Sequence, residues 1–202
     1  MSEYNAQQRQ AYEVALSGIE ALGPEGLARL REEVAPYLAF RARVDDFLAR
    51  HVSELCTEVC FTDKTSACCS KEGIITFFAD AVVNALSSPS EMLEAMISRL
   101  EEDPPGPKCV YLSPSGCLWK VTPIVCVMFL CDRAEEKIRQ DGAEETWRAL
   151  KEERNSFTYP NRPVLFDAIE ETFLRLGLSS GLMHLHMSPG LLRVKKKSGL
   201  IP

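Results

Sequence analysis

The sequence predicts a mostly α-helical fold, in which a helical scaffold surrounds an irregular cysteine-rich centre with a short hairpin. Apolar residues recur at three- and four-residue spacing in the first and last parts of the chain, as on the buried face of a helix. All eight cysteines fall in the central part, which is also rich in turn residues. We therefore expect one domain over residues 1–202, made of a helical N-terminal part, a cysteine core and a helical C-terminal part with a tail: 1–55, 56–131 and 132–202.

The N-terminal part is expected to form two helices. The first carries an inward-facing apolar stripe and ends at Gly23-Pro24; the stripe comprises Tyr12, Ala15, Leu16, Ile19 and Leu22. Proline is well tolerated in the first turn of a helix, so the second helix is expected to begin there. Pro36 predicts an interruption or a kink within it. The helix then leads to Cys56, and one further turn would place Cys56 and Cys60 on the same face.

Two more helices are expected between the two halves of the cysteine core. The first covers about residues 71–86, with an inner face of Ile74, Ile75, Phe78, Val82 and Leu86. Ser88-Pro89-Ser90-Glu91 has the pattern of a capping box, with serine at the N-cap and glutamate three residues later. The helix that follows would bury Leu93, Met96, Ile97 and Leu100.

From Cys109 to Trp119, strand-forming residues flank a Pro-Ser-Gly turn, which predicts a short irregular hairpin. Thr122-Pro123 has the pattern of a helix start, with threonine at the N-cap. Two or three further helices are expected in the C-terminal part, around residues 135–140, 144–153 and 164–176. Gly177 is expected to close the last of them.

The formal net charge of −6 argues against general binding to nucleic acid or anionic membranes, because both depend on excess lysine and arginine. The one basic concentration, Arg193 with Lys195, Lys196 and Lys197, is interpreted as a solvated tail, with a partner-binding arm as the alternative. The N-terminus lacks a signal-peptide pattern. The longest apolar run is far shorter than the ~20 residues that cross a bilayer. We therefore expect a cytoplasmic protein with reduced thiols, without nucleic-acid or membrane partners.

The eight cysteines form two groups of four, separated by two predicted helices: Cys56, Cys60, Cys68 and Cys69, then Cys109, Cys117, Cys126 and Cys131. Thiolates are soft ligands that suit zinc, iron and iron–sulfur clusters. The groups could serve two four-sulfur sites or one site assembled from both. Disulfides and buried metal-free cysteines are the alternatives. The missing secretion signal argues against the first, and the clustering argues against the second.

The spacing does not identify the metal. The C-x₂-C pairs of zinc knuckles are absent, and the ferredoxin patterns do not match. This irregularity favours an iron–sulfur centre slightly over zinc or mononuclear iron. Adjacent Cys68 and Cys69 would be strained as ligands of one ion. We expect them to serve two different ions, or one of them to pack while the other ligates.

The cysteine pattern resembles the YkgJ-type cysteine-cluster family. The resemblance runs from Cys56 to Cys131 and includes all eight thiols, Gly116, Trp119 and Pro123 in order. That family is described as a zinc- or iron-chelating domain, also found in flagellin lysine N-methylases. Members commonly have Arg-Pro where this chain has Thr122-Pro123, and Cys-Arg where it has Cys126-Val127. Any role of those arginines in relatives is therefore in doubt here.

The resemblance implies a metal-binding protein that ligates zinc, iron or an iron–sulfur cluster through its eight cysteines. Two alternatives stay open: an enzyme that uses the cluster for redox chemistry or protein modification, and a structural zinc module that binds a protein partner. Common nucleotide, hydrolase and zinc-protease motifs are absent, so no catalytic residue is predicted. His184 and His186 are interpreted as packing or surface residues rather than ligands, and His51 as an exposed helical residue.

Overall fold

The computed structural model describes these residues of the chain: 2–56, 58, 62, 69–70, 75–102, 106, 108–113, 116–158, 164–183 and 199. Their secondary structure is mostly helical, with one small two-stranded sheet, which confirms the mostly α-helical part of the prediction. None of the helices in these ranges is long and apolar enough to cross a membrane.

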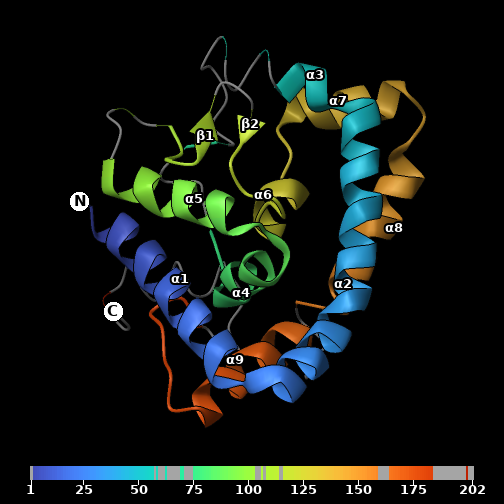
Figure 1. Cartoon of the computed structure of the whole chain (residues 1–202). Helices are drawn as coiled ribbons and strands as arrows, with labels where there is room; N and C mark the ends of the chain where they lie inside the picture. The colour runs from blue at the N-terminus through green and yellow to red at the C-terminus, as the bar shows by residue number, and fades with distance from the viewer. Residues whose placement is uncertain are drawn as a thin grey trace.

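Two long helices form the frame of the molecule (Figure 1). Helix α1 spans Glu3–Ala21, and helix α2 spans Gly23–His51. Gly23 has a φ of +64°, a left-handed conformation that glycine adopts without strain, and Pro24 lies in the first turn of α2 as expected. Of the two outcomes predicted at Pro36, an interruption or a kink, the interruption is not found, because α2 is continuous through this residue; Figure 1 shows that the helix bends along its length.

The apolar stripe of α1 is confirmed in part. Tyr12 and Ala15 are buried, and Ile19 and Leu22 pack at the edge of the core. Leu16 was expected to face inward, and this is wrong: its side chain is 38% exposed. Ala11 is buried instead, next to Tyr12. Small buried residues such as Ala11 and Ala15 let α1 pack closely on the helices beneath it.

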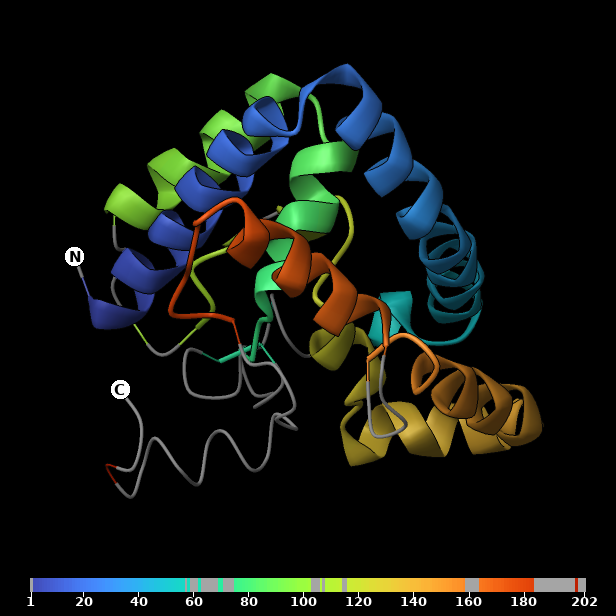
Figure 2. The same ribbon diagram turned by 90° about the horizontal axis from the view of Figure 1, so that it is seen from below.

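Helix α4, Phe78–Ser87, lies at the centre of the molecule, and helix α5, Ser90–Glu102, follows it. Helix α1 packs on both, while α4 also packs on the last helix, α9, which spans Leu165–Arg175. Figure 2 shows α4 enclosed by α1, α2 and α9. The helix predicted from about residue 71 begins later, since residues 75–77 are not helical; residues 71–74 lie outside the described ranges.

The predicted hairpin is confirmed. Strand β1, Leu112–Ser113, pairs antiparallel with β2, Gly116–Cys117, and Leu112 lies opposite Cys117. Gly116 has a φ of +103°, which favours glycine at the end of the turn. The short helix α6, Ile124–Met128, follows. Its N-cap is Pro123 and not Thr122, so that expectation was off by one residue.

The remaining helices cover the side of the molecule formed by α2. These are α3, Ser53–Cys56; α7, Asp132–Gln140; and α8, Glu144–Arg154. Helix α2 packs against α3, α7, α8 and α9, and α7 packs against α8. The three predicted C-terminal helices are therefore confirmed, although α7 begins three residues earlier than expected. Gly177, at a φ of +75°, follows α9 as predicted.

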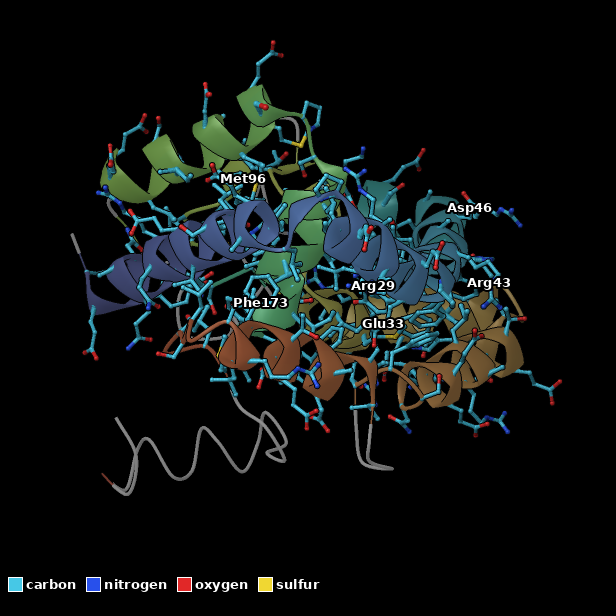
Figure 3. All side chains as sticks on the ribbon, turned by 60° about the horizontal axis from the view of Figure 1, so that its bottom comes forward. Arg29, Glu33, Arg43, Asp46, Met96 and Phe173 are labelled. Carbon is cyan, nitrogen blue, oxygen red and sulfur yellow. The ribbon has the colours of Figure 1, made fainter. Side chains whose placement is uncertain are left out.

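Aromatic side chains fill the contacts between these helices. Phe78 of α4 and Phe173 of α9 meet edge to face with ring centroids 5.0 Å apart. Figure 3 shows Phe173 between α9 and α1, where Gly18 leaves room for its ring. Near the hairpin, Trp119 packs against Tyr12 and Tyr111, with centroids 5.4 and 5.2 Å apart. The aromatic residue of the cysteine motif thus anchors the hairpin to α1.

Candidate metal centre

Two polar side chains on the buried helix α4 hold the chain that carries Cys117 and Cys126. Asn84 forms two hydrogen bonds with Val121: its Nδ2 donates to the carbonyl oxygen at 2.7 Å, and its Oδ1 accepts from the amide at 3.1 Å. One turn earlier, Asp80 Oδ1 accepts from the amide of Ile124 at 3.2 Å. The segment that leads into α6 is therefore held by hydrogen bonds from side chains to its backbone, as a neighbouring β-strand would hold it with its own backbone.

Asp80 is a buried carboxyl group, 2% exposed. Its second oxygen accepts from the amide of Phe77 at 2.9 Å, and so caps α4. Loss of water raises the pKa of Asp80 to about 6, against the opposing effect of the two amide hydrogen bonds and of Arg41. A carboxyl group with a pKa near neutrality therefore lies inside the protein next to the start of α6.

Cys117 ends β2, Cys126 lies in α6 and Cys109 precedes β1; we call these three cysteines the three-thiol group. Burial raises the pKa of Cys126 strongly, and the charges of Asp80, Cys117 and Cys109 raise it further, so these groups lie within electrostatic range of one another. Partial desolvation also raises the pKa of Cys117, although its side chain is exposed at the surface of β2; the Trp119 amide and the Thr122 hydroxyl oppose this. Without a metal ion, both thiols are held in the neutral form.

The two sequence groups of cysteines meet at the hairpin. The amide of Cys109 donates to the carbonyl oxygen of Cys69 at 2.9 Å, and Ser70 forms an antiparallel β-bridge with Lys108. Backbone contact thus places a cysteine from the first group directly beside the three-thiol group. This relation could not be read from the spacing, because two helices separate the cysteines in sequence.

The other two described cysteines lie at the junction of α3 and α7. Cys56 is the last residue of α3, and Cys131 is the N-cap of α7. Their neighbours Leu55 and Asp132 line the same open hollow of about 640 Å³, on the face of the molecule where α3 and α7 meet. Here again a residue from the first group and one from the second come to the same region.

The described part of the chain does not contain a complete metal shell. Among these residues no group of three or more His, Cys, Asp or Glu side chains is arranged to hold an ion. Cys60 and Cys68 lie outside the described residues, as do His184, His186 and the basic tail. His51 is 22% exposed, and its Nδ1 lies 2.8 Å from Asp141 Oδ2. Within the described ranges its ring nitrogen therefore contacts a carboxylate and not a cysteine.

Two side chains carry buried hydrogen-bond donors that the sequence did not indicate. Within the described chain, the buried Tyr4 hydroxyl and the Nε and NH2 groups of Arg41 have no hydrogen-bond partner. Buried polar groups are normally satisfied, so these atoms are exceptions. Arg41 could have been noticed, because it occupies a core position between Tyr37 and Val44 in the repeat of α2.

Comparison of the chain with family models, curated proteins and solved structures gave no match. The resemblance to the cysteine-cluster family therefore stays a prediction from the motif.

Proposed function

We propose that this protein binds a thiophilic metal, as zinc, iron or an iron–sulfur cluster, through the eight cysteines between Cys56 and Cys131. The observation that carries the proposal is the backbone junction at the hairpin, where the Cys109 amide donates to the Cys69 carbonyl oxygen at 2.9 Å and so brings together one cysteine of each sequence group. Soft thiolates gathered in this way are the ligands that zinc and iron–sulfur centres use. The Asn84 and Asp80 contacts support it, because metal sites need ligands held on rigid elements.

We further propose two centres, each assembled from both sequence groups. The hydrogen bond between the Cys109 amide and the Cys69 carbonyl oxygen supports grouping Cys69 with the three-thiol group, while Cys56 and Cys131 adjoin Leu55 and Asp132, which line the hollow at α7. Cys60 and Cys68 are assigned to the second centre to complete four ligands in each. Adjacent Cys68 and Cys69 then serve different ions, which avoids the strain of adjacent ligands on one ion. Each centre would cross-link the chain and stabilise the fold.

The test is metal and sulfide analysis of protein purified without oxygen, combined with visible absorption. Stoichiometric metal in the wild-type protein, with less metal and lower thermal stability in Cys60→Ser and Cys117→Ser, is the expected result. Iron with labile sulfide and a brown colour identifies an iron–sulfur protein, whereas a colourless zinc protein identifies a structural module. Unchanged metal content in both serine variants would overturn the proposal.

A second candidate is a metal-stabilised module that binds a protein partner, and one observation favours it. Phe129, between Cys126 and Cys131, is 72% exposed and lies just after α6. Exposed aromatic residues are enriched at protein interfaces. Replacement of Phe129 by Ala should then preserve metal content and stability but remove the binding of a protein partner by the purified protein. Leu174→Ala is the matched control, because Leu174 is also exposed. Loss of metal in Phe129→Ala would instead show that the ring supports the centre.

A further inference from the structure

The segment that follows α9 returns to helices α1 and α4 as a short strap, residues 178–183 (Figure 2). The side chain of Gln10 on α1 holds the middle of this strap. Its Nε2 donates to the carbonyl oxygen of Ser179 at 3.1 Å. Its Oε1 accepts from the Ser180 hydroxyl at 2.8 Å and from the Gly181 amide at 3.4 Å. One side chain of α1 therefore binds three successive residues of the strap.

The far end of the strap meets the start of α4. The carbonyl oxygen of Leu182 accepts from the amide of Phe78, the first residue of α4, at 3.1 Å. The Leu182 side chain is 6% exposed and belongs to the hydrophobic core. The first amides of a helix have no acceptor within the helix. The strap therefore supplies the acceptor that the first residue of α4 needs.

The same turn of α4 also holds the chain that leads to Cys126. Asp80 accepts from the amide of Phe77 through one carboxyl oxygen, at 2.9 Å, and from the amide of Ile124 through the other, at 3.2 Å. Ile124 begins α6, which contains Cys126. Hydrogen bonds thus connect the strap to Phe78, and the first turn of α4 to the start of α6.

The strap is the part of this arrangement that opens most easily. Leu182 is its one buried residue; Ser179 and Gly181 are exposed, and the others are half-buried. Segments with few buried side chains and exposed hydrogen bonds open at a lower free energy than the core. When the strap opens, the amide of buried Phe78 loses its acceptor. An unsatisfied buried donor is unfavourable, so the first turn of α4 must shift to find another partner.

We propose that the strap is a latch for the first turn of α4. When closed, it holds this turn in the conformation in which Asp80 accepts from the Ile124 amide. When open, it releases both the turn and the start of α6 while the other helices stay folded. The latch thereby couples the end of α9 to the segment between Cys117 and Cys126. It does not require a bound metal, so it stands or fails independently of the proposed function.

The experiment is amide hydrogen exchange, followed by NMR on the full-length protein under reducing conditions. Gln10→Ala removes the anchor of the strap but no buried apolar group, so this variant should fold. The amides of Phe78 and Ile124 should then exchange about tenfold faster than in the wild type. The Trp147 amide, bonded to Ala143 in the α8 region, should keep its wild-type rate.

Two further variants complete the comparison. Leu182→Ala removes the buried side chain of the strap, so it should accelerate exchange at Phe78 and Ile124 at least as much as Gln10→Ala. Gln7→Ala is the matched control, because Gln7 lies on the same helix and its side chain bonds to exposed Glu3. This control should exchange like the wild type at all three amides.

Three results would overturn the latch. Faster exchange at Phe78 with an unchanged rate at Ile124 would show that the strap opens without releasing the start of α6. Equal acceleration at Phe78, Ile124 and Trp147 would show a general loss of stability. Unchanged exchange at Phe78 in both Gln10→Ala and Leu182→Ala would show that the strap does not protect the start of α4.

Discussion

The amide nitrogen of Cys109 donates a hydrogen bond to the carbonyl oxygen of Cys69, at 2.9 Å. This bond joins the two halves of the cysteine core through the backbone, and the β-bridge between Ser70 and Lys108 extends it. The junction does not depend on side-chain chemistry. It can therefore bring the two cysteine groups into register before any ion binds.

Metal removal should weaken this junction. The Cys109 amide should exchange its hydrogen faster in metal-free protein than in loaded protein, because ligands on both sides no longer hold the strands together. The Trp147 amide, bonded to Ala143 in the α8 region, should exchange at the same rate in both states. Hydrogen exchange followed by NMR measures both. Equal protection of Cys109 in the two states would contradict a metal-dependent junction.

Two centres predict partial losses of metal. Cys109→Ser should remove about half of the bound metal, Cys131→Ser should remove the other half, and the double variant should bind almost none. Each loss should lower the melting temperature, since bound metal stabilises the folded state. Elemental analysis per chain and thermal unfolding measure the two effects. Complete loss in either single variant would indicate one centre shared by all the ligands.

Asn84→Ala should destabilise the protein by about 2–4 kcal/mol, because the amide and carbonyl of buried Val121 would both lose their partner. Urea unfolding of the metal-free protein measures this loss without a contribution from metal binding. Asn155→Ala is the control, because this asparagine is partly exposed and its side chain accepts a hydrogen bond from Arg154. Its replacement should lower the free energy of unfolding by less than about 1 kcal/mol. A similar cost for both would indicate that Asn84 does not hold the segment before α6.

Asp80 should make the metal-free protein less stable as pH rises from about 4 to about 6. Burial raises its pKa in the folded state to about 6 from an ordinary value of 3.8. In this window the folded protein keeps a proton that the unfolded chain has lost, so stability falls as pH rises. The shift of about 2 units corresponds to about 3 kcal/mol. Asp80→Asn should flatten this part of the curve, as measured by urea unfolding at several pH values.

Asp141 provides a control of opposite sign. Hydrogen bonds from Lys137 and His51 lower the pKa of its carboxyl group. Its contribution is therefore present above its ordinary pKa near 3.8 and is lost as pH falls through the lowered value. Asp141→Asn should alter the curve below about pH 4 and leave the Asp80 window unchanged. An equal effect of both variants between about pH 4 and 6 would contradict the assignment to Asp80.

Gly18→Ala should destabilise the contact between α1 and α9 by about 1–3 kcal/mol. A Cβ atom at this position would overlap the ring of Phe173, which is fully buried against Phe78 and cannot turn away. Gly181→Ala is the control, because a Cβ there meets no atom within 4 Å. Thermal unfolding compares the two. Tolerance of Gly18→Ala would show that α9 can shift away from α1.

The sequence predicted the helices and the hairpin well, because their apolar periodicity and turn residues are local. It was less accurate at the boundaries and bends of helices. The helix predicted from residue 71 begins at Phe78, since Asp80 caps it there. Pro36 does not break α2, whose packing along its length outweighs one missing hydrogen bond.

The candidate site was predictable only as a set of ligand types. The cysteine pattern indicated metal chemistry. The contact between Cys69 and Cys109, however, depends on how α4 and α5, which lie between them in sequence, bring Cys109 back beside Cys69. Tyr4 and Arg41 lie outside the motif and on separate helices. Because their burial depends on tertiary packing, no spacing rule could have indicated these buried donors.

Helix α4 has a consequence for the order in which the chain acquires its structure. Every residue from Phe78 to Asn84 is buried, and ten residues are too few for a helix to persist alone in water. Its environment is complete only when α9 has been added, near the end of the described chain. On the ribosome, α1 and α2 would emerge first, and their apolar faces would stay exposed until the later helices pack on them. The Asp80 and Asn84 contacts that hold the segment between Cys117 and Cys126 would therefore become permanent only when the final helix packs on α4.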